Sequence, residues 1–556
     1  MKRCPECRRD YYDDSLLYCL DDGSALLEGP ASSDEPATAI FPDLDATDRL
    51  TQGKLPKGDD PLPPKPRTGG IRLWVPAVVA SIVIVTGYLA YQYFYKPLSR
   101  QPISSIAVLP FEDQSGDANF DYLSRGISES LIYGLSKFHD LKVSPSSSVA
   151  QYKGTDANIA TIAHELGVDS VLKGRLAQFG DNLTVSVELV DARNDRVIWG
   201  HQYDRKLLDL LSVQRDIANE IVRNLRLQTT SADRISLNKS YTENTEAYML
   251  YLRGRYFWDK RNREANELAI NSYNEAITLD PAYALAYAGL ADCYLFPQSS
   301  EPLSVTISKA RNFASRALEL DDTLAEAHTT LAFVRMRFDY DWPGAEREFK
   351  RAIELDPKYP IAHQFYGVML FATGRIEEGT KQVDRALELE PRSVAISWTK
   401  GMTLNFARRY DDSIVQLQKV LKMDQSYQLA LSTLVNVCVQ KGLFDEALAT
   451  LVKLEAQNMD TKLSRAYVYA LAGRRDEAAR LLSEQKQRTE RPPGFSVNAA
   501  KVETALGKKE DALRSLEQAY ENRDFTVIFL KVEPAFDPLR DDPRFEELLK
   551  KVGLTS

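Results

Sequence analysis

The sequence predicts a multidomain protein in which a small cysteine-containing module and a single transmembrane helix precede an α/β domain and an all-α solenoid. Three observations lead to this prediction. Cys4, Cys7 and Cys19 crowd the first twenty residues, residues 73–95 carry no charged side chain, and a 34-residue pattern recurs in the second half of the 556-residue chain. A chain of this length is too long for one hydrophobic core and divides into several units.

The overall charge disfavours nucleic acid as a main partner. The formal net charge is -9, whereas phosphate binding needs concentrated Lys and Arg. The first thirty residues repeat this balance, because four basic side chains stand against seven acidic ones. Cys293 and Cys438 stand alone inside helical patterns and are predicted to fill hydrophobic cores. We expect a protein or peptide partner, and neither nucleic acid nor a small-molecule substrate.

The N-terminal cysteines have the spacing of a metal site. Cys4 and Cys7 flank a tight turn, so both sulfur atoms can reach one zinc ion. Cys19 begins a second half, in which Asp22 stands three residues on, where a fourth cysteine is expected. Three thiolates and one carboxylate form a chemically possible structural Zn2+ site. The alternative is a degenerate module that binds no metal and folds poorly.

The stretch CPECRRDYYDDSLLYCLDDGSALL, within residues 1–29, resembles short bacterial zinc-ribbon modules, some of which carry the same Asp before Gly. The resemblance implies a zinc-ribbon-like module. Residues 30–70 follow, rich in Pro, Asp, Thr and Gly and without sustained periodicity. Such a segment buries too little apolar surface to offset its ordering entropy, so we predict a flexible linker.

Residues 73–95 have the length and composition of a membrane span. This segment contains 23 consecutive uncharged residues, and a helix of that length measures about 34 Å, enough to cross the hydrocarbon core. Trp74 lies at one edge, and Tyr91 and Tyr95 lie near the other, as in aromatic belts. The alternatives are a buried helix of a soluble domain and a cleaved signal peptide, which the distance from Met1 disfavours. We predict a single-pass transmembrane helix.

Lysine and arginine residues on the two sides of this segment predict its orientation. The C-terminal flank carries only Lys96 and Arg100. The N-terminal flank carries a larger basic set: Lys54, Lys57, Lys65, Arg67 and Arg72. The positive-inside rule then places residues 1–72 in the cytoplasm and residues 96–556 outside it, in the periplasm if the membrane is a bacterial inner membrane. A reducing cytoplasm would also keep the N-terminal cysteines as thiols.

Residues 103–228 alternate strand and helix signals and predict one compact α/β domain. Strands are expected at 106–111, 141–143, 170–179, 183–191 and 196–203, and helices at 120–138, 157–166 and 207–227. The last three strands alternate apolar and polar residues. The turns between them, at 180–182 and 193–195, are short enough for antiparallel hairpins.

Four motifs in this region carry a resemblance to a known domain family. SIAVLPFEDQSGD (105–117), ISESLIYGLSK (127–137), ELGVDSVLKGRL (165–176) and VIWGHQYDR (197–205) resemble the TolB amino-terminal-type domain. Such domains accompany helical repeats in bacterial membrane proteins, including receptor-like kinases, adenylate cyclases and CadC-type regulators. The resemblance implies a fold and an extracytoplasmic location, and it transfers no catalytic residue. The alternative function is a signalling protein related to these cyclases and regulators, with an unrecognised output activity.

The second half of the chain carries a repeat of fixed length. AITLDP ends at Pro281, AIELDP at Pro357 and ALELEP at Pro391, and the last two prolines are 34 residues apart. A period of 34 residues is that of the tetratricopeptide repeat, in which two antiparallel helices pack through small residues. Gly442, Gly473 and Gly507 are expected at the turns between the two helices of later repeats.

About eight tetratricopeptide repeats are predicted within residues 244–522. Their ranges are 246–281, 284–322, 325–357, 360–391, 394–425, 428–458, 460–489 and 493–522. The segment 523–556, which includes PAFDPLRDDPRFEELLKKVGL, is expected to cap the exposed end of the stack with a final helix.

A stack of such repeats predicts a concave inner face, lined by the first helix of each repeat, on which a polypeptide can bind. In the tetratricopeptide family the inner face binds an extended peptide or a partner helix. The corresponding positions are Gln364, Val368, Phe371, Trp398, Met402, Asn405, Phe406, Asn436, Val439 and Gln440. This set is apolar and rich in amides, and it lacks the basic residues with which chaperone-binding relatives clamp a carboxylate. For each position, packing against the next repeat is the alternative, and the role requires an inner face open to a second chain.

The sequence contains no legible catalytic motif. No glycine-rich phosphate loop precedes a lysine in a strand, and neither His-Arg-Asp nor Asp-Phe-Gly occurs. His164 and Glu165 lack the second histidine of a metalloprotease helix. A transcriptional regulator would need a basic winged-helix domain before residue 73, and none is recognisable there. We predict a membrane-anchored scaffold, sensor or adaptor that is not an enzyme.

Overall fold

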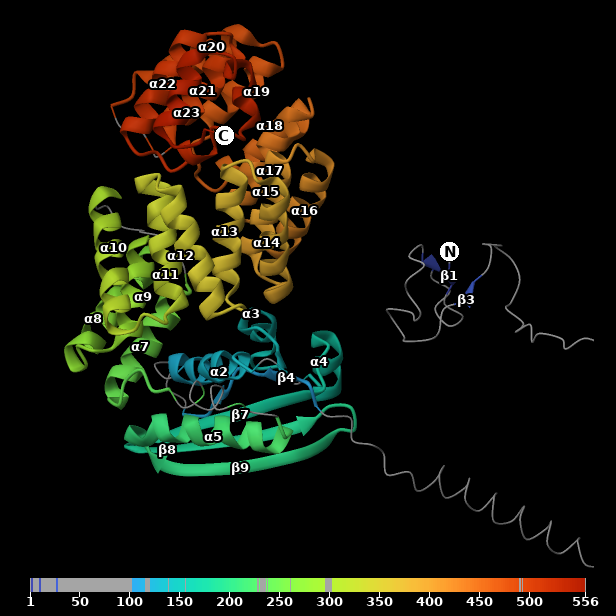
Figure 1. Cartoon of the computed structure of the whole chain (residues 1–556), viewed down its shortest axis with the longest axis vertical. Coiled ribbons are helices and arrows are strands. Elements are labelled where there is room, and N and C mark those ends of the chain that lie inside the picture. Colours follow the sequence, from blue (N-terminus) through green and yellow to red (C-terminus); the bar gives the residue numbers. More distant parts are fainter. Residues whose placement is uncertain are drawn as a thin grey trace, which may run out of the picture. The chain divides into compact units, whose positions relative to one another are not determined.

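The computed structural model describes residues 2–3, 10–11 and 27–28, and residues 103–555 except 116–120, 139, 156, 228–229, 231–236, 238, 261, 296–302, 490–491 and 493 (Figure 1). The chain forms two units, residues 1–98 and residues 99–556.

Three short strands are described in the first unit. Strand β1 (Lys2–Arg3) pairs in antiparallel fashion with both β2 (Asp10–Tyr11) and β3 (Leu27–Glu28). The predicted zinc ligands, the linker 30–70 and the transmembrane helix 73–95 lie outside the described residues. Among the helices that the structure does describe, none combines the length and the apolar character needed to cross a membrane. The transmembrane helix therefore stays a prediction.

The second unit begins with a mixed sheet whose strand order is β6-β4-β7-β8-β9, with β5 pairing beside β7. The pairings of β4 with β6 and β7 are parallel, and β7, β8 and β9 form antiparallel hairpins. The strands are β4 (Ser105–Val108), β5 (Glu112–Asp113), β6 (Lys142–Val143), β7 (Ser170–Phe179), β8 (Asn182–Asp191) and β9 (Arg196–Lys206). The predicted α/β domain and its two hairpins are confirmed. Strand β9 extends three residues further than predicted, because Lys206 still pairs with Asn182.

Helices cover both faces of this sheet. On one face, α2 (Asp121–Ser136) and α5 (Leu210–Leu225) pack against side chains such as Ile106 and Leu172. On the other, α3 (Ser146–Val149) and α4 (Ile159–Leu166) share a smaller core with Ala107. Successive residues of β4 serve opposite faces because side chains alternate along a strand.

The rest of the second unit is a solenoid, and in its described residues eight helix pairs follow one another. The pairs are α7 (Thr245–Trp258) with α8 (Arg263–Leu279), α9 (Ala284–Leu295) with α10 (Leu303–Leu320), α11 (Ala325–Val334) with α12 (Trp342–Leu355), α13 (Pro360–Ala372) with α14 (Ile376–Leu389), α15 (Val394–Phe406) with α16 (Tyr410–Met423), α17 (Gln428–Gln440) with α18 (Phe444–Glu455), α19 (Lys462–Leu471) with α20 (Arg475–Lys486), and α21 (Phe495–Ala505) with α22 (Lys509–Glu521). Each pair falls within or beside one predicted repeat range.

Small residues let the helices of a repeat approach closely. A Cβ atom on Gly379 would lie 2.6 Å from the Phe371 ring, and one on Gly367 would lie 2.6 Å from Val383. Gly442 lies in the turn between its two helices with a φ of 74°, a left-handed conformation that glycine adopts without strain. The packing therefore explains why small residues recur with the period of the repeat.

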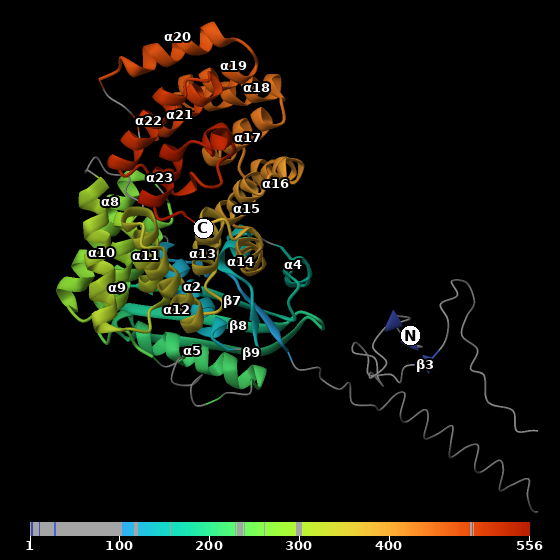
Figure 2. The same cartoon turned by 45° about the horizontal axis from the view of Figure 1, so that its top comes forward.

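The α/β domain packs directly on the solenoid. Helix α2 lies between the sheet and the first helix pairs (Figures 1 and 2), and Arg125 forms an ion pair of 2.5 Å with Asp259 at the end of α7. Lys137 pairs with Asp356, and the Lys358 ammonium donates a hydrogen bond of 2.8 Å to the carbonyl oxygen of Phe138. The two domains therefore share an interface within one compact unit, in which these polar contacts lie beside the apolar contacts of Tyr248 and Leu252 from α7.

Candidate functional site

The inner face of the solenoid, where the sequence predicts a peptide groove, is largely buried in the structure. Most of the predicted contact residues have little or no exposed surface: Gln364, Val368, Phe371, Asn405, Phe406 and Val439 are buried, and Trp398, Met402, Asn436 and Gln440 are half-buried. Two separate causes explain this burial, namely the C-terminal part of the chain and hydrogen bonds between consecutive repeats.

The first cause is the closing segment, which we define as residues 523–555. It contains the 3-10 turns η5 (Val527–Phe529) and η6 (Pro534–Leu539) and the helix α23 (Pro543–Lys551). The ring of Phe529 stacks on Phe406 with centroids 4.9 Å apart, and Val368 and Phe371 belong to the same core. Figures 1 and 2 show this stretch of the ribbon returning toward α13 and α15.

Two arginines fasten the closing segment to the third repeat. Arg337 donates a hydrogen bond of 3.0 Å to the carbonyl oxygen of Phe525, and Arg523 donates one of 2.9 Å to the carbonyl oxygen of Phe338. The Arg337 guanidinium also lies over the rings of Phe333, Phe525 and Phe529. Burial lowers the pKa of Arg337 to about 10, and the electron-rich ring faces offset part of the desolvation of its charge.

The closing segment buries a large apolar surface in the solenoid. Val527, Ile528, Leu530, Phe536 and Leu539 are fully buried. Each such side chain contributes about 1.5–3 kcal/mol, so the five together contribute roughly 8–15 kcal/mol. The closing segment is therefore part of the folded core.

The prediction that Val368, Phe371 and Phe406 line an open groove is therefore wrong. Their apolar side chains face the closing segment because its own apolar run, FTVIFL at 525–530, also needs burial. The segment was expected to cap the end of the stack, and α23 does pack on α22. It also reaches back to the middle of the solenoid, which that expectation did not include.

The second cause is a set of hydrogen bonds between consecutive repeats. The amide of Gln364 donates to the Thr399 hydroxyl at 2.8 Å, and the indole of Trp398 donates to the Thr433 hydroxyl at 2.9 Å. These two bonds each join residues 35 positions apart and so repeat the same contact one repeat later. Gln440 likewise donates to the Tyr467 hydroxyl at 3.0 Å. These side chains connect neighbouring repeats, as the alternative interpretation proposed.

The remaining predicted residues divide between core and surface. Val439 belongs to the core of the later repeats, and Met402 packs on the core that contains the closing segment. Asn405 is buried, and within the described residues its Oδ1 atom has no hydrogen-bond partner. Asn436 is half-buried on α17. Leu429, two turns earlier on the same helix, is 48% exposed. The open part of the inner face is therefore centred on α15 and α17.

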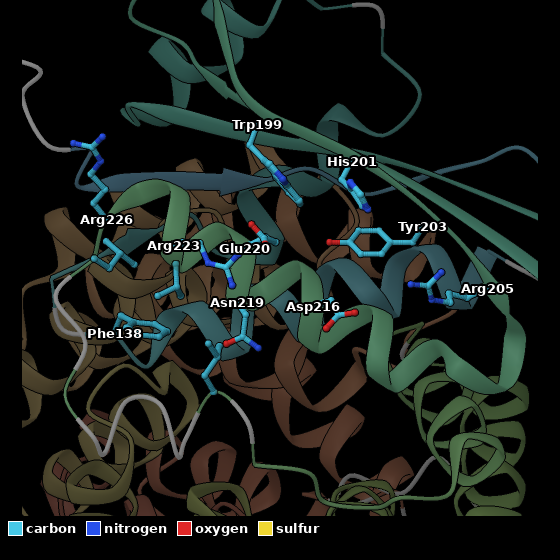
Figure 3. A pocket seen from close by; sticks show the side chains of 13 residues that line it. Phe138, Trp199, His201, Tyr203, Arg205, Asp216, Asn219, Glu220, Arg223 and Arg226 are labelled. Atoms are coloured by element: carbon cyan, nitrogen blue, oxygen red, sulfur yellow. Dashed lines mark hydrogen bonds and ion pairs between the residues drawn. The ribbon is translucent and has the colours of Figure 1, made fainter.

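A separate cavity of about 910 Å³ lies in the α/β domain, between strand β9 and helix α5 (Figure 3). Trp199, His201 and Tyr203 of β9 line one wall, because alternate residues of a strand face the same side. Tyr203 is buried, Trp199 is half-buried and His201 is exposed. The three side chains form a row of rings along the outermost strand of the sheet.

The three rings differ in their relative orientation. The rings of Trp199 and His201 are nearly parallel, with an interplanar angle of 10° and centroids 6.5 Å apart. The ring of Tyr203 meets His201 edge-on, at 70° and 4.6 Å. Burial, and then the negative charges of Asp216 and Glu220, raise the pKa of Tyr203 to about 12. The Tyr203 hydroxyl therefore stays protonated near neutral pH.

Helix α5 supplies the polar wall of the cavity. Asp216, Asn219, Glu220 and Arg223 recur at helical spacing beside the face of α5 that packs on the sheet. Arg223 forms an ion pair of 2.5 Å with Glu220. Asn219 donates to the Arg215 carbonyl oxygen at 2.9 Å.

This cavity is not among the sites predicted from the sequence. The signal was present as WGHQY at 199–203, in which every second residue is aromatic or His201. No cluster of three or more His, Cys, Asp or Glu side chains suited to a metal occurs in the described part of the chain. The predicted ligands Cys4, Cys7, Cys19 and Asp22 lie outside that part.

Comparison with known families matches two regions of the chain. A family model described as the second domain of HilA/YgeH-like transcriptional regulators matches residues 102–220. A tetratricopeptide-repeat model matches residues 341–394. The chain is thus a tetratricopeptide-repeat protein with an α/β domain. The resemblance of that domain to the TolB amino-terminal type stays a prediction.

Individual relatives cover different shares of the chain. A putative adenylate cyclase 3 of Rhizobium meliloti is 30% identical over 231 residues, which are 41% of this chain and 39% of the relative. The transcriptional regulator HilA of Salmonella typhimurium is 24% identical over 420 residues, 72% of each chain. A Pseudomonas aeruginosa pilF structure is 20% identical, with a TM-score of 0.31, and covers 37% of this chain and 92% of its own. The chain thus spans about two fifths of the length of the cyclase.

Proposed function

We propose that this tetratricopeptide-repeat protein is a membrane-anchored scaffold or sensor that binds a polypeptide partner outside the cytoplasm. The observation that supports a binding role most directly is the solenoid of eight helix pairs in the described residues, since stacked helical repeats present long continuous surfaces. The uncharged segment 73–95 and its basic N-terminal flank support a single-pass anchor with residues 1–72 in the cytoplasm.

The closing segment restricts where the partner binds. Because it occupies the inner face near Phe371 and Phe406, we assign binding to the open part of that face on α15 and α17. Trp398, Leu429 and Asn436 each retain exposed surface there. A half-exposed tryptophan beside an exposed leucine suits an apolar segment of a partner polypeptide.

Site-specific photocrosslinking of the full-length chain in membranes tests this assignment. A photoreactive residue at Leu429 should give one reproducible crosslinked protein, and Trp398→Ala should abolish that product. Val415, which is 54% exposed on α16, provides a matched control on the second helix of a repeat. Equal crosslinking from both positions would contradict a partner on the inner face.

A cytoplasmic zinc module is the second part of the proposal. Cys4, Cys7, Cys19 and Asp22 would hold a structural Zn2+ ion, whose role is to tie the short module together. The pairing of β1 with both β2 and β3 supports this, because it joins chain segments on both sides of the cysteines in one sheet. One zinc per chain is expected by metal analysis, and Cys19→Ser should lower that content without changing the crosslinks from Leu429.

A signalling protein with an output activity is the alternative. The similarity to a putative adenylate cyclase and to the regulator HilA favours it. We propose that the chain itself is not an enzyme and transmits binding to other proteins. Reproducible nucleotide cyclisation or phosphotransfer by the purified full-length protein would support the alternative. A periplasm-specific reporter fused after Ser556 should be active, and activity of a cytoplasm-specific reporter there would overturn the proposed topology.

A further inference from the structure

We propose that the cavity between β9 and α5 is a binding site for a small molecule that carries a planar aromatic ring and an anionic group. The proposal concerns residues that the scaffold function does not use. It follows from the spacing of two rings and from the charges at the cavity wall.

The rings of Trp199 and His201 form the two walls of a slot on one face of β9. Their rings are nearly parallel with centroids 6.5 Å apart, a separation set by the rise of two residues along a strand, about 6.6 Å. The distance between the two ring planes is at most this centroid separation, whereas a planar ring between them needs two contacts of about 3.5 Å, or roughly 7 Å in all. Binding therefore requires the exposed His201 to move away from Trp199, which is half-buried against the core.

The neighbouring contacts favour one position for the guest ring. Tyr203 contacts His201 with centroids 4.6 Å apart, and Figure 3 shows Trp199 and Tyr203 on different sides of the His201 ring. We therefore place the guest ring on the side of His201 toward Trp199. The loss of one stacking contact between a planar ring and an aromatic side chain typically weakens binding roughly 5- to 150-fold.

The cavity wall carries side chains of both charges, with arginines in the majority. Three arginines line the cavity, Arg205, Arg223 and Arg226, against the carboxylates of Asp216 and Glu220. The pair Arg223–Glu220 neutralises one charge of each sign. Arg205 is exposed and donates to the carbonyl oxygen of Asp204 at 3.1 Å, and no ion pair to it occurs within the described residues. A planar guanidinium with free N–H donors suits a carboxylate, sulfonate or phosphate oxygen.

A substitution of Asp216 tests whether the ligand is an anion or a cation. The Asp216 carboxylate is exposed on α5 and raises the pKa of Tyr203, so its field reaches the aromatic row. For an anionic ligand, Asp216→Asn removes a repulsion and should strengthen binding. For a cationic ligand the same change should weaken it.

The test uses the full-length chain in lipid nanodiscs and two probes that differ in charge sign. Naphthalene-1-sulfonate and naphthalene-1-methylamine are titrated by calorimetry, with empty nanodiscs as the blank. The sulfonate should bind in a saturable manner and the amine should bind more weakly. Competition by adenosine monophosphate or by indole-3-acetate then distinguishes a nucleotide from an aromatic carboxylate as the class of ligand.

Matched substitutions on one strand locate the site. His201→Ala removes one wall of the slot and should weaken binding of the sulfonate roughly 5- to 150-fold, the effect of losing one stacking contact. Arg205→Glu should weaken binding of the sulfonate, and Asp216→Asn should strengthen it. Gln202 lies on the opposite face of β9, so Gln202→Ala should leave the affinity for the sulfonate unchanged. Circular dichroism melting of each variant verifies folding. The proposal fails if neither probe binds, if the amine binds better, or if Gln202→Ala matches His201→Ala.

Discussion

The indole nitrogen of Trp342 donates a hydrogen bond of 2.7 Å to the carbonyl oxygen of Val552, 210 residues later in the chain. Trp342 begins the second helix of the third repeat, and Val552 follows the last helix of the chain. This bond, together with the arginine contacts of Arg337 and Arg523, joins the end of the chain to the middle of the solenoid. The solenoid is therefore not a stack in which each repeat touches only its neighbours.

Removing residues 523–556 should destabilise the repeats and should not free a binding groove. The truncation would expose the apolar side chains of Val368, Phe371 and Phe406, which the closing segment covers. We expect a lower and broader thermal transition and aggregation, measured by circular dichroism and light scattering. A truncated protein that remains folded and binds peptides more tightly would show that the closing segment can leave the inner face without unfolding the repeats.

Arg337→Ala should lower the free energy of unfolding by roughly 2–4 kcal/mol, because it removes a buried charged hydrogen bond to Phe525 and the contacts with three aromatic rings. Urea unfolding followed by circular dichroism measures the change. Arg347→Ala, an exposed position on α12, is the matched control and should change stability by less than about 0.5 kcal/mol. Equal effects would mean that the contacts of Arg337 contribute little.

Stability should fall as pH rises through the titration of Glu390. Burial, and then the negative charge of Asp259, raise the pKa of Glu390 to about 7. Because the folded-state pKa lies above the unfolded value near 4.5, the folded state binds the extra proton between about pH 4.5 and 7. The charged form is therefore disfavoured in the folded state, and the cost is complete above about pH 7.

Thermal melting between pH 5 and 8 measures this dependence. Glu390→Gln should flatten the curve and raise the midpoint at pH 8 relative to the unaltered protein. Glu388→Gln removes an exposed carboxylate two residues away, paired with Arg385, and is the control. If both variants keep the original pH dependence, Glu390 does not titrate in this range.

Lys137 and Asp356 should show a measurable coupling across the interface of the α/β domain and the solenoid. Their ion pair is largely shielded from water, with 20% and 9% of the two side chains exposed. A double-mutant cycle of Lys137→Met and Asp356→Asn should give a coupling of about 1 kcal/mol or more. A control double-mutant cycle combines Asp356→Asn with Lys381→Met in place of Lys137→Met. A coupling near zero in the first cycle would mean that the pair does not stabilise the interface.

Much of the local structure could be predicted from residue patterns. Strand β7 (Ser170–Phe179) has the predicted bounds because buried and less buried residues alternate from Leu172 to Leu176, whereas Ser170 and Val171 before them are buried as well. The repeats could be predicted because Gly379, Ala386 and their equivalents recur with the period of a helical hairpin. Both signals are local, since they depend only on residues within one element or one repeat.

The sequence by itself determined the order of the α/β domain and the repeats, and it marked the residues of the first helices that face inward. Only the tertiary structure decided what covers those residues. Phe371 and Phe406 are apolar whether the closing segment or another chain covers them, because the hydrophobic effect has no direction and does not specify a partner. The cavity beside Trp199 and His201 was hidden for a similar reason, since its other wall belongs to α5, which only folding brings opposite β9.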